Sequence, residues 1–234
     1  MSLICKQLFE HDSSTFTYLL ADSVTREAAI IDAVDSMIER DIALIQELEL
    51  DLKFIIETHI HADHITSACP LKKTFPLAKI VIGIENTDAE ACADIMVGEG
   101  HILPIGEHEI VAIETPGHTP GFISYLVDDK VFTGDALFIR STGRCDFQGG
   151  SASTLYHSIH KLFRLPDSTL VYPGHDYNGF TVSTIGEEKE YNSLIRLDFD
   201  EKTFVKKVGN LNLEPPKKIN TAVPANHSCG LIRN

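Results

Sequence analysis

Seven histidine and aspartate residues constrain this chain more than any other feature of its sequence. Four of them lie within six positions, in the string THIHADH at residues 58–64, directly after an apolar run at 54–56. The other three each follow a glycine in a later turn. The seven are His59, His61, Asp63, His64, His118, Asp135 and His175. Imidazole nitrogens and carboxylate oxygens are the ligands that borderline divalent metals take, so the set predicts a metal site.

Each of these ligand-bearing segments follows a predicted strand. The four strands are expected at 53–57, 109–114, 130–134 and 169–172. Ligands at successive strand ends converge on one edge of a sheet, where open α/β sheets usually keep their sites. Because side chains alternate along a strand, His59, His61 and Asp63 are expected to point one way and His64 the other, provided that the extended geometry continues past residue 57.

The apolar periodicity of the whole chain predicts an α/β fold. Further strands are expected at 3–9, 15–21, 28–32, 79–83 and 122–127, and helices at 36–49, 65–75, 88–97, 151–163, 187–195 and 201–209. Such a mixture favours two layers of sheet covered by helices, without an internal linker. At 234 residues the chain is expected to form a single domain, 1–234.

Charge and hydropathy exclude two classes of partner. The net charge is −14, and no basic run is present that would hold a phosphate backbone, so no nucleic-acid partner is expected. No stretch approaches the ~18 apolar residues of a membrane span. The sequence therefore favours a small-molecule substrate and no membrane association.

The cysteines indicate a reducing environment. Their number is odd, no CxxC spacing occurs, and a disulfide scaffold is not expected. The five are Cys5, Cys69, Cys92, Cys145 and Cys229. The N-terminus shows no signal or transit character, so the expected location is the cytoplasm, or the mitochondrial matrix if a leader has been removed.

The order of the ligand motifs resembles that of the metallo-β-lactamase superfamily, which implies an αββα sandwich. Within it, several strings are similar to the persulfide dioxygenases (sulfur dioxygenases) of the ethylmalonic encephalopathy protein type, which are glyoxalase II-like. These strings are HADHIT (61–66), GDALFIR (134–140), GRCDFQ (143–148), TLYHSIH (154–160), GFTVST (179–184) and GNLNL (209–213). Glyoxalase II carries a helical C-terminal domain, whereas only about sixty residues follow His175 here.

The resemblance also implies which of the seven residues bind metal. By analogy with the persulfide dioxygenases, one Fe(II) per chain is held by His59, His118 and Asp135, a two-histidine, one-carboxylate set that suits iron oxygenases. The remaining four would support these ligands through hydrogen bonds. The four supporting residues are His61, Asp63, His64 and His175. The residues alone leave a two-metal site open. By analogy with the two-metal hydrolases of the superfamily, Asp135 would bridge two ions, one held by His59, His61 and His118 and the other by Asp63, His64 and His175.

The reaction implied by the resemblance is the oxidation of glutathione persulfide by O2 and water to sulfite and glutathione. Arg144 is the candidate for a glutathione carboxylate, because a guanidinium binds carboxylates bidentately; pairing with Asp146 is its alternative. Tyr177 is the candidate for the pocket wall. Cys145 is expected to be an inert thiol. Because relatives often form dimers, the resemblance also implies a homodimer.

Two other functions are compatible with parts of this pattern. The first is a two-metal hydrolase of S-acylglutathione thioesters, which the complete set of seven ligands permits. The second is a non-catalytic binding module, which is disfavoured because such a protein would be expected to have lost ligands. Some relatives have cysteine where this chain has Thr142, so no role that needs that thiol is expected.

Overall fold

The computed structural model describes residues 2–86, 89 and 91–231. Two compact units make up the chain, the first comprising residues 1–97, 102–110 and 215–234 and the second residues 98–101 and 111–214. Two six-stranded mixed sheets and several helices confirm the predicted α/β class. No described helix has the length and apolar character that crossing a membrane requires.

The first sheet mixes antiparallel and parallel pairing. Its strands are, in order, β1 (Leu3–Glu10), β2 (Thr15–Asp22), β3 (Glu27–Ile31), β4 (Asp51–Ile56), β5 (Lys79–Gly83) and β6 (Ile95–Val97). β1 to β3 pair antiparallel, and β3 to β6 pair parallel. Parallel strands end at the same edge of a sheet, so the residues that follow β3 and β4 come together there.

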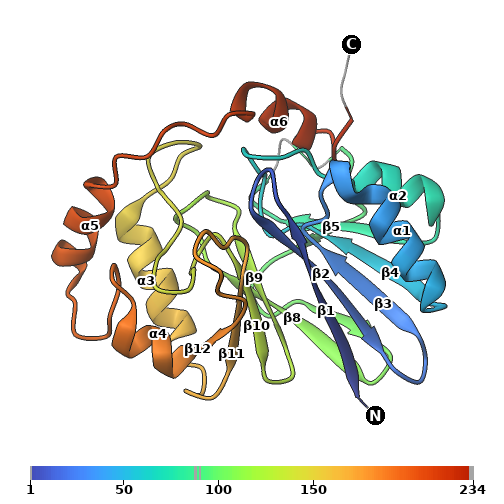
Figure 1. Cartoon of the computed structure of the whole chain (residues 1–234), viewed down its shortest axis with the longest axis horizontal. Coiled ribbons are helices and arrows are strands. Elements are labelled where there is room, and N and C mark those ends of the chain that lie inside the picture. The colour runs from blue at the N-terminus through green and yellow to red at the C-terminus, as the bar shows by residue number, and fades with distance from the viewer. Residues whose placement is uncertain (1, 87–88, 90, 232–234) are drawn as a thin grey trace. The chain divides into compact units, whose positions relative to one another are not determined.

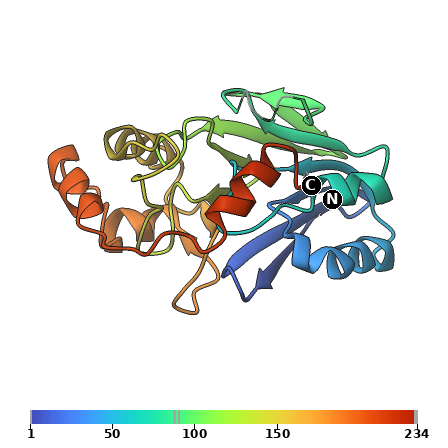
Figure 2. The ribbon, with the colours of Figure 1, turned by 90° about the horizontal axis from the view of Figure 1, so that it is seen from above.

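Two helices cover one face of this sheet, α1 (Ile38–Glu47) and α2 (Ala68–Thr74) (Figures 1 and 2). α1 follows a short 3-10 turn at Asp35–Met37 and lies within the predicted helix 36–49; its Ile45 is fully buried in the core of this unit. α2 starts three residues later than predicted and holds Pro70 in its first turn, where a missing N–H costs no helical hydrogen bond. A further helix, α6 (Ile219–Asn226), was not predicted.

The second sheet has the order β12-β11-β10-β9-β8-β7. The bounds are β7 (Ile102–Ile105), β8 (His108–Glu114), β9 (Ile123–Val127), β10 (Lys130–Gly134), β11 (Leu170–Pro173) and β12 (Ser183–Thr184). The helices of the second unit are α3 (Ala152–Leu162), α4 (Ile185–Tyr191) and α5 (Glu201–Gly209). They bury Leu155, Ile185 and Phe204 against Val131 and Val171 of the sheet. Burying such side chains contributes about 1.5–3 kcal/mol each.

One predicted helix is wrong. Residues 95–97 of the predicted helix 88–97 form strand β6, which pairs with β5 through Val81 and Ile95. Residues 88 and 90 lie outside the described part of the chain. The segment is rich in alanine and acidic residues, but pairing with an available sheet edge overrides so weak a local preference. The short strands β7 and β12 were also missed.

The cysteines form one disulfide, which the sequence did not predict. Cys92 and Cys229 form a disulfide across 137 residues of sequence. Only CxxC spacing and cysteine number were available from the sequence, and neither reports a pair that the fold brings together from such distant positions. The expectation of a reducing compartment rested on the absence of disulfides, so it loses its support.

Candidate metal centre

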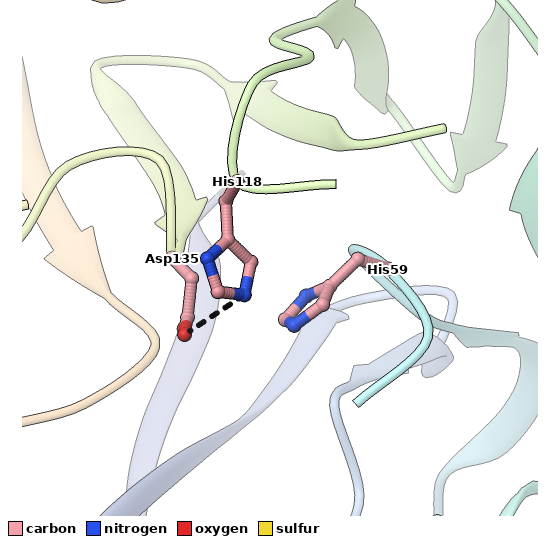
Figure 3. Close-up of side chains that lie close together, drawn as sticks. All are labelled: His59, His118 and Asp135. Carbon is pink, nitrogen blue, oxygen red and sulfur yellow. Dashed lines mark ion pairs between the residues drawn. The ribbon is translucent and has the colours of Figure 1, made fainter. Parts of the chain in front are cut away.

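The histidine loop of the first unit begins where β4 ends, at Ile56. His59 (Figure 3), His61 and His64 are all buried. The ring centroids of His59 and His61 lie 4.1 Å apart, and those of His61 and His64 lie 4.3 Å apart. Ligand atoms of His61, Asp63 and His64 lie within 4.8 Å of one another. The predicted alternation of His64 away from His61 and Asp63 is therefore wrong, because the strand ends before the ligands begin.

His59 is held in one tautomer by its neighbour. Its Nδ1 lies 2.9 Å from the Thr58 hydroxyl, and that hydroxyl donates to Asp32 at 2.9 Å. Since a carboxylate only accepts, the Thr58 proton points to Asp32 and the hydroxyl must accept from His59 Nδ1–H. The lone pair of His59 Nε2 is then the one available to a metal.

Two buried carboxylates flank His61, and the sequence reasoning missed both. His61 Nε2 lies 3.1 Å from Asp32 Oδ1 and 3.3 Å from Glu57 Oε2. Burial alone lowers the pKa of His61, but the charges and hydrogen bonds of Asp32 and Glu57 outweigh it and place this pKa well above its usual value. Burial also raises the pKa of Glu57, which accepts a hydrogen bond from the Thr66 hydroxyl.

A signal for both carboxylates was present in the sequence. Each one directly follows an apolar parallel strand, Asp32 after β3 and Glu57 after β4. The same position after β10 identified Asp135. Asp32 and Glu57 were instead assigned to the strands themselves, at 28–32 and 53–57, so their place at the edge of the sheet was overlooked.

The donor atoms of the first unit suit a cation. Among the described residues, His61 Nδ1 and His64 Nε2 are buried and make no hydrogen bond. Buried polar atoms without partners are rare in folded proteins and are explained when an ion or water occupies the adjacent space. The other nitrogen of His64, Nδ1, lies 3.0 Å from Asp63 Oδ2. An imidazole held by a carboxylate in this way is typical of metal-binding histidines.

In the second unit, His118, Asp135 and His175 come together at one edge of the sheet. Asp135 follows β10 and His175 follows the parallel neighbour β11. Asp135 Oδ2 lies 3.5 Å from His118 Nε2 (Figure 3). Asp135 Oδ1 lies 3.4 Å from His175 Nε2. Ligands about 2.1 Å from one metal at right angles are themselves about 3 Å apart, so these spacings suit a shared cation.

His118 is held in the same tautomer as His59. Its Nδ1 lies 2.6 Å from the carbonyl oxygen of Arg144, which can only accept, so Nδ1 carries the proton. The Nε2 lone pair of His118 therefore faces Asp135, in the orientation that a metal ligand needs. The residues of each unit thus fit a metal by the chemistry of their donor atoms.

Arg144 makes the contact that the sequence left open as its alternative. Its guanidinium binds Asp146 bidentately, at 2.6 Å from Nε and 2.7 Å from Nη2. The same group donates to the carbonyl oxygens of Glu214 at 2.7 Å and Leu213 at 3.2 Å. Arg144 therefore links the loop that contains Asp146 to residues 213 and 214, which follow α5. Its contact with a substrate stays a prediction.

Tyr177 and Cys145 differ sharply in exposure. Tyr177 is 68% exposed and stacks on the ring of His175, with 5.8 Å between centroids. Its predicted role in lining a substrate pocket stays untested.

Cys145 is partly buried, and burial raises the pKa of its thiol to about 12. A thiol with this pKa stays protonated at neutral pH, as expected of an inert cysteine.

The chain is similar to several known proteins. The family model described as the metallo-beta-lactamase superfamily matches residues 12–175. "Persulfide dioxygenase ETHE1, mitochondrial" of Homo sapiens is 47% identical over 232 residues, which covers 98% of this chain and 89% of that protein. "Glyoxylase B2" of Dictyostelium discoideum is 34% identical, covering 84% of this chain and 80% of that protein. The crystal structure of ETHE1 from Myxococcus xanthus has a TM-score of 0.93 and 46% identity, covering 97% of this chain and 100% of that one.

Proposed function

This chain belongs to the metallo-β-lactamase superfamily. We propose that its activity is that of a persulfide dioxygenase. The observation that carries the proposal is the 47% identity to the human persulfide dioxygenase over nearly the whole chain. The proposed reaction consumes glutathione persulfide, O2 and water, and yields glutathione, sulfite and two protons. Oxidation takes place at the outer persulfide sulfur, and O2 is the oxidant.

One Fe(II) per chain is the proposed cofactor, with His59, His118 and Asp135 as its ligands. The tautomers support this assignment, because Nδ1 of each histidine donates to an oxygen atom and leaves Nε2 as the ligand atom. Two histidines and one carboxylate leave open coordination positions, as non-haem iron oxygenases require. When bound, Fe(II) would supply the redox chemistry by which O2 reacts.

The remaining four histidines and aspartates are proposed to hold the ligands in place. His64 Nδ1 lies 3.0 Å from Asp63 Oδ2, and His61 Nε2 contacts the carboxylates of Asp32 and Glu57. His175 lies 3.4 Å from Asp135 and limits where that carboxylate can turn. Residues that orient metal ligands in this way typically change metal affinity or activity about 10–100-fold when they are mutated.

Arg144 is the proposed anchor for a carboxylate of glutathione. Its guanidinium has five N–H donors in a fixed plane, which suits a carboxylate. To bind glutathione in bidentate geometry it would have to release Asp146, which it holds in that geometry here. Substitution Arg144→Ala is expected to raise the KM for glutathione persulfide about 10-fold or more, and to change kcat less. Arg164→Ala, on the same unit, is the control. An unchanged KM would remove Arg144 from substrate binding.

A two-metal hydrolase of S-acylglutathione thioesters is the weaker second candidate. Two observations favour it: all seven candidate ligands are present, and among the described residues the buried atoms His61 Nδ1 and His64 Nε2 make no hydrogen bond. Similarity to "Glyoxylase B2" is lower, at 34% identity. The two candidates differ in metal number, oxygen consumption and substrate.

The test compares both reactions in one preparation. The chain is purified without oxygen, its iron and zinc are counted, and O2 uptake is followed with glutathione persulfide. One iron per chain and one O2 consumed per sulfite formed are expected. Two zinc ions per chain, no O2 uptake and rapid hydrolysis of S-lactoylglutathione would replace the proposal with the hydrolase.

A further inference from the structure

The segment after α6 runs along the histidine loop of the first unit, although more than 150 residues of sequence separate them. Asn226 is the last residue of α6, and residues 227–230 follow it as a turn. The N–H of Cys69, in α2, donates to the carbonyl oxygen of Cys229 at 3.0 Å. The disulfide between Cys92 and Cys229 ties the same segment to the chain beyond β5.

The side chain of Asn226 makes three hydrogen bonds, all to the backbone of the histidine loop. Its Nδ2 donates to the carbonyl oxygens of His61 at 2.8 Å and His64 at 2.9 Å. Its Oδ1 accepts from the N–H of Thr66 at 2.9 Å. Asn226 is only 2% exposed, so water does not replace these contacts.

This loop needs a partner of that kind. Residues 57–67 form neither helix nor regular strand, and only an isolated bridge joins Thr66 to Val34, so most of their backbone groups lie outside a ladder of hydrogen bonds. Buried N–H and carbonyl groups must be paired, because an unpaired one costs free energy. A single amide side chain supplies both kinds of partner, two N–H donors and one acceptor, whereas aspartate has no donor and leucine has neither.

The close approach of the two segments is fixed at a second point. Gly230 has a φ of +86°, and a Cβ atom added there would lie 2.0 Å from the carbonyl oxygen of Thr66. Only glycine fits this contact without displacing the loop. Asn226 and Gly230 thus bracket the C-terminal turn, and both touch the loop between His61 and Thr66.

We propose that Asn226 is a positioning residue for the metal centre: it fixes the backbone of the histidine loop between His61 and Thr66 and thereby the rings of His61 and His64. The proposal rests on the proposed function in that these residues bind or support a metal. It does not depend on the reaction that the metal carries out.

The test measures binding of Co²⁺ to metal-free protein under argon, for Asn226→Asp and for the control Asn220→Asp. Asn220 is exposed on the same helix, so the control makes the same change of charge and leaves the loop contacts intact. In Asn226→Asp, a carboxylate faces the carbonyl oxygens of His61 and His64, and the two donated hydrogen bonds are lost. Co²⁺ affinity is expected to fall about 10–100-fold, and the visible absorption bands of the saturated Co²⁺ protein are expected to shift.

The spectrum separates positioning from simple loss of stability, because a destabilised but correctly arranged site keeps its bands once it is saturated with Co²⁺. If Asn226→Asp fails to fold, Asn226→Ser is measured in its place, since serine keeps one hydroxyl donor. Wild-type affinity and wild-type bands in a folded Asn226 variant would overturn the proposal, as would an equal loss in Asn220→Asp. A wild-type chain that binds Co²⁺ but, loaded with iron, consumes no O2 would refute only the proposed function.

Discussion

Removing the disulfide is expected to lower the stability of the folded chain by several kcal/mol, because the bond closes a long loop. Cys92 and Cys229 are joined across 137 residues. In the chain-entropy treatment, closing a loop of this length lowers the free energy of the folded state relative to the unfolded state by ~5 kcal/mol at 25 °C. Removal of native disulfides typically costs about 2–5 kcal/mol, so Cys92→Ser is expected to fall in that range.

The assay is equilibrium unfolding in guanidinium chloride at pH 7 without reductant, followed by circular dichroism. Wild-type protein treated with dithiothreitol is expected to match Cys92→Ser, because both lack the same bond. Cys5→Ser, outside the disulfide, is the control and is expected to stay within about 0.5 kcal/mol of wild type. A loss below about 1 kcal/mol in Cys92→Ser, or an intact mass that shows five thiols in the untreated protein, would refute the reasoning.

Three further predictions concern the ligands and two titratable groups. Asp135→Ala is expected to abolish iron binding, whereas His64→Ala keeps part of it; equal loss of iron in both variants, measured by elemental analysis, would favour two metals. Backbone N–H groups of Thr25, Glu107 and Val24 lower the pKa of Asp22 to about 2. The ionised Asp22 therefore stabilises the fold fully above about pH 4, and this stabilisation is lost as the pH falls from about 4 to 2. The difference in unfolding free energy between wild type and Asp22→Asn, measured by urea titration, should shrink over that window. A difference that stays constant would contradict the lowered pKa of Asp22. Cys145, with a pKa raised to about 12, is expected to resist iodoacetamide at pH 8 in the folded protein, and rapid modification seen by mass spectrometry would show that its thiol is not buried.

Local pattern was sufficient to predict most of the elements that carry ligands. β4, β8, β10 and β11 all end within two residues of their predicted ends, because each apolar strand stops at a glycine, proline or polar turn. Segment 88–97 shows where this reasoning stops. Its composition favours a helix, but Ile95 pairs with Val81 of β5, and a contact with a distant strand is invisible to local pattern.

The same limit explains what was missed around the metal centre. Asp32 and Glu57 reach His61 because parallel strands bring their ends together, and Asn226 reaches the histidine loop from 165 residues away. The disulfide is a third contact of this kind. Residues whose proposed role depends on their own chemistry, such as the seven candidate ligands, could be proposed from the sequence. Residues whose role depends on which distant backbone or side-chain group they contact could be identified only from the three-dimensional structure.

The most direct test of the proposed function is the stoichiometry of oxygen use by the anaerobically purified chain. With one Fe(II) per chain, glutathione persulfide should drive O2 uptake, and one sulfite should appear for each O2 consumed. The activity should disappear on removal of iron and return when Fe(II), but not Zn²⁺, is added back. A chain that carries two zinc ions, consumes no O2 and hydrolyses S-lactoylglutathione would contradict the account.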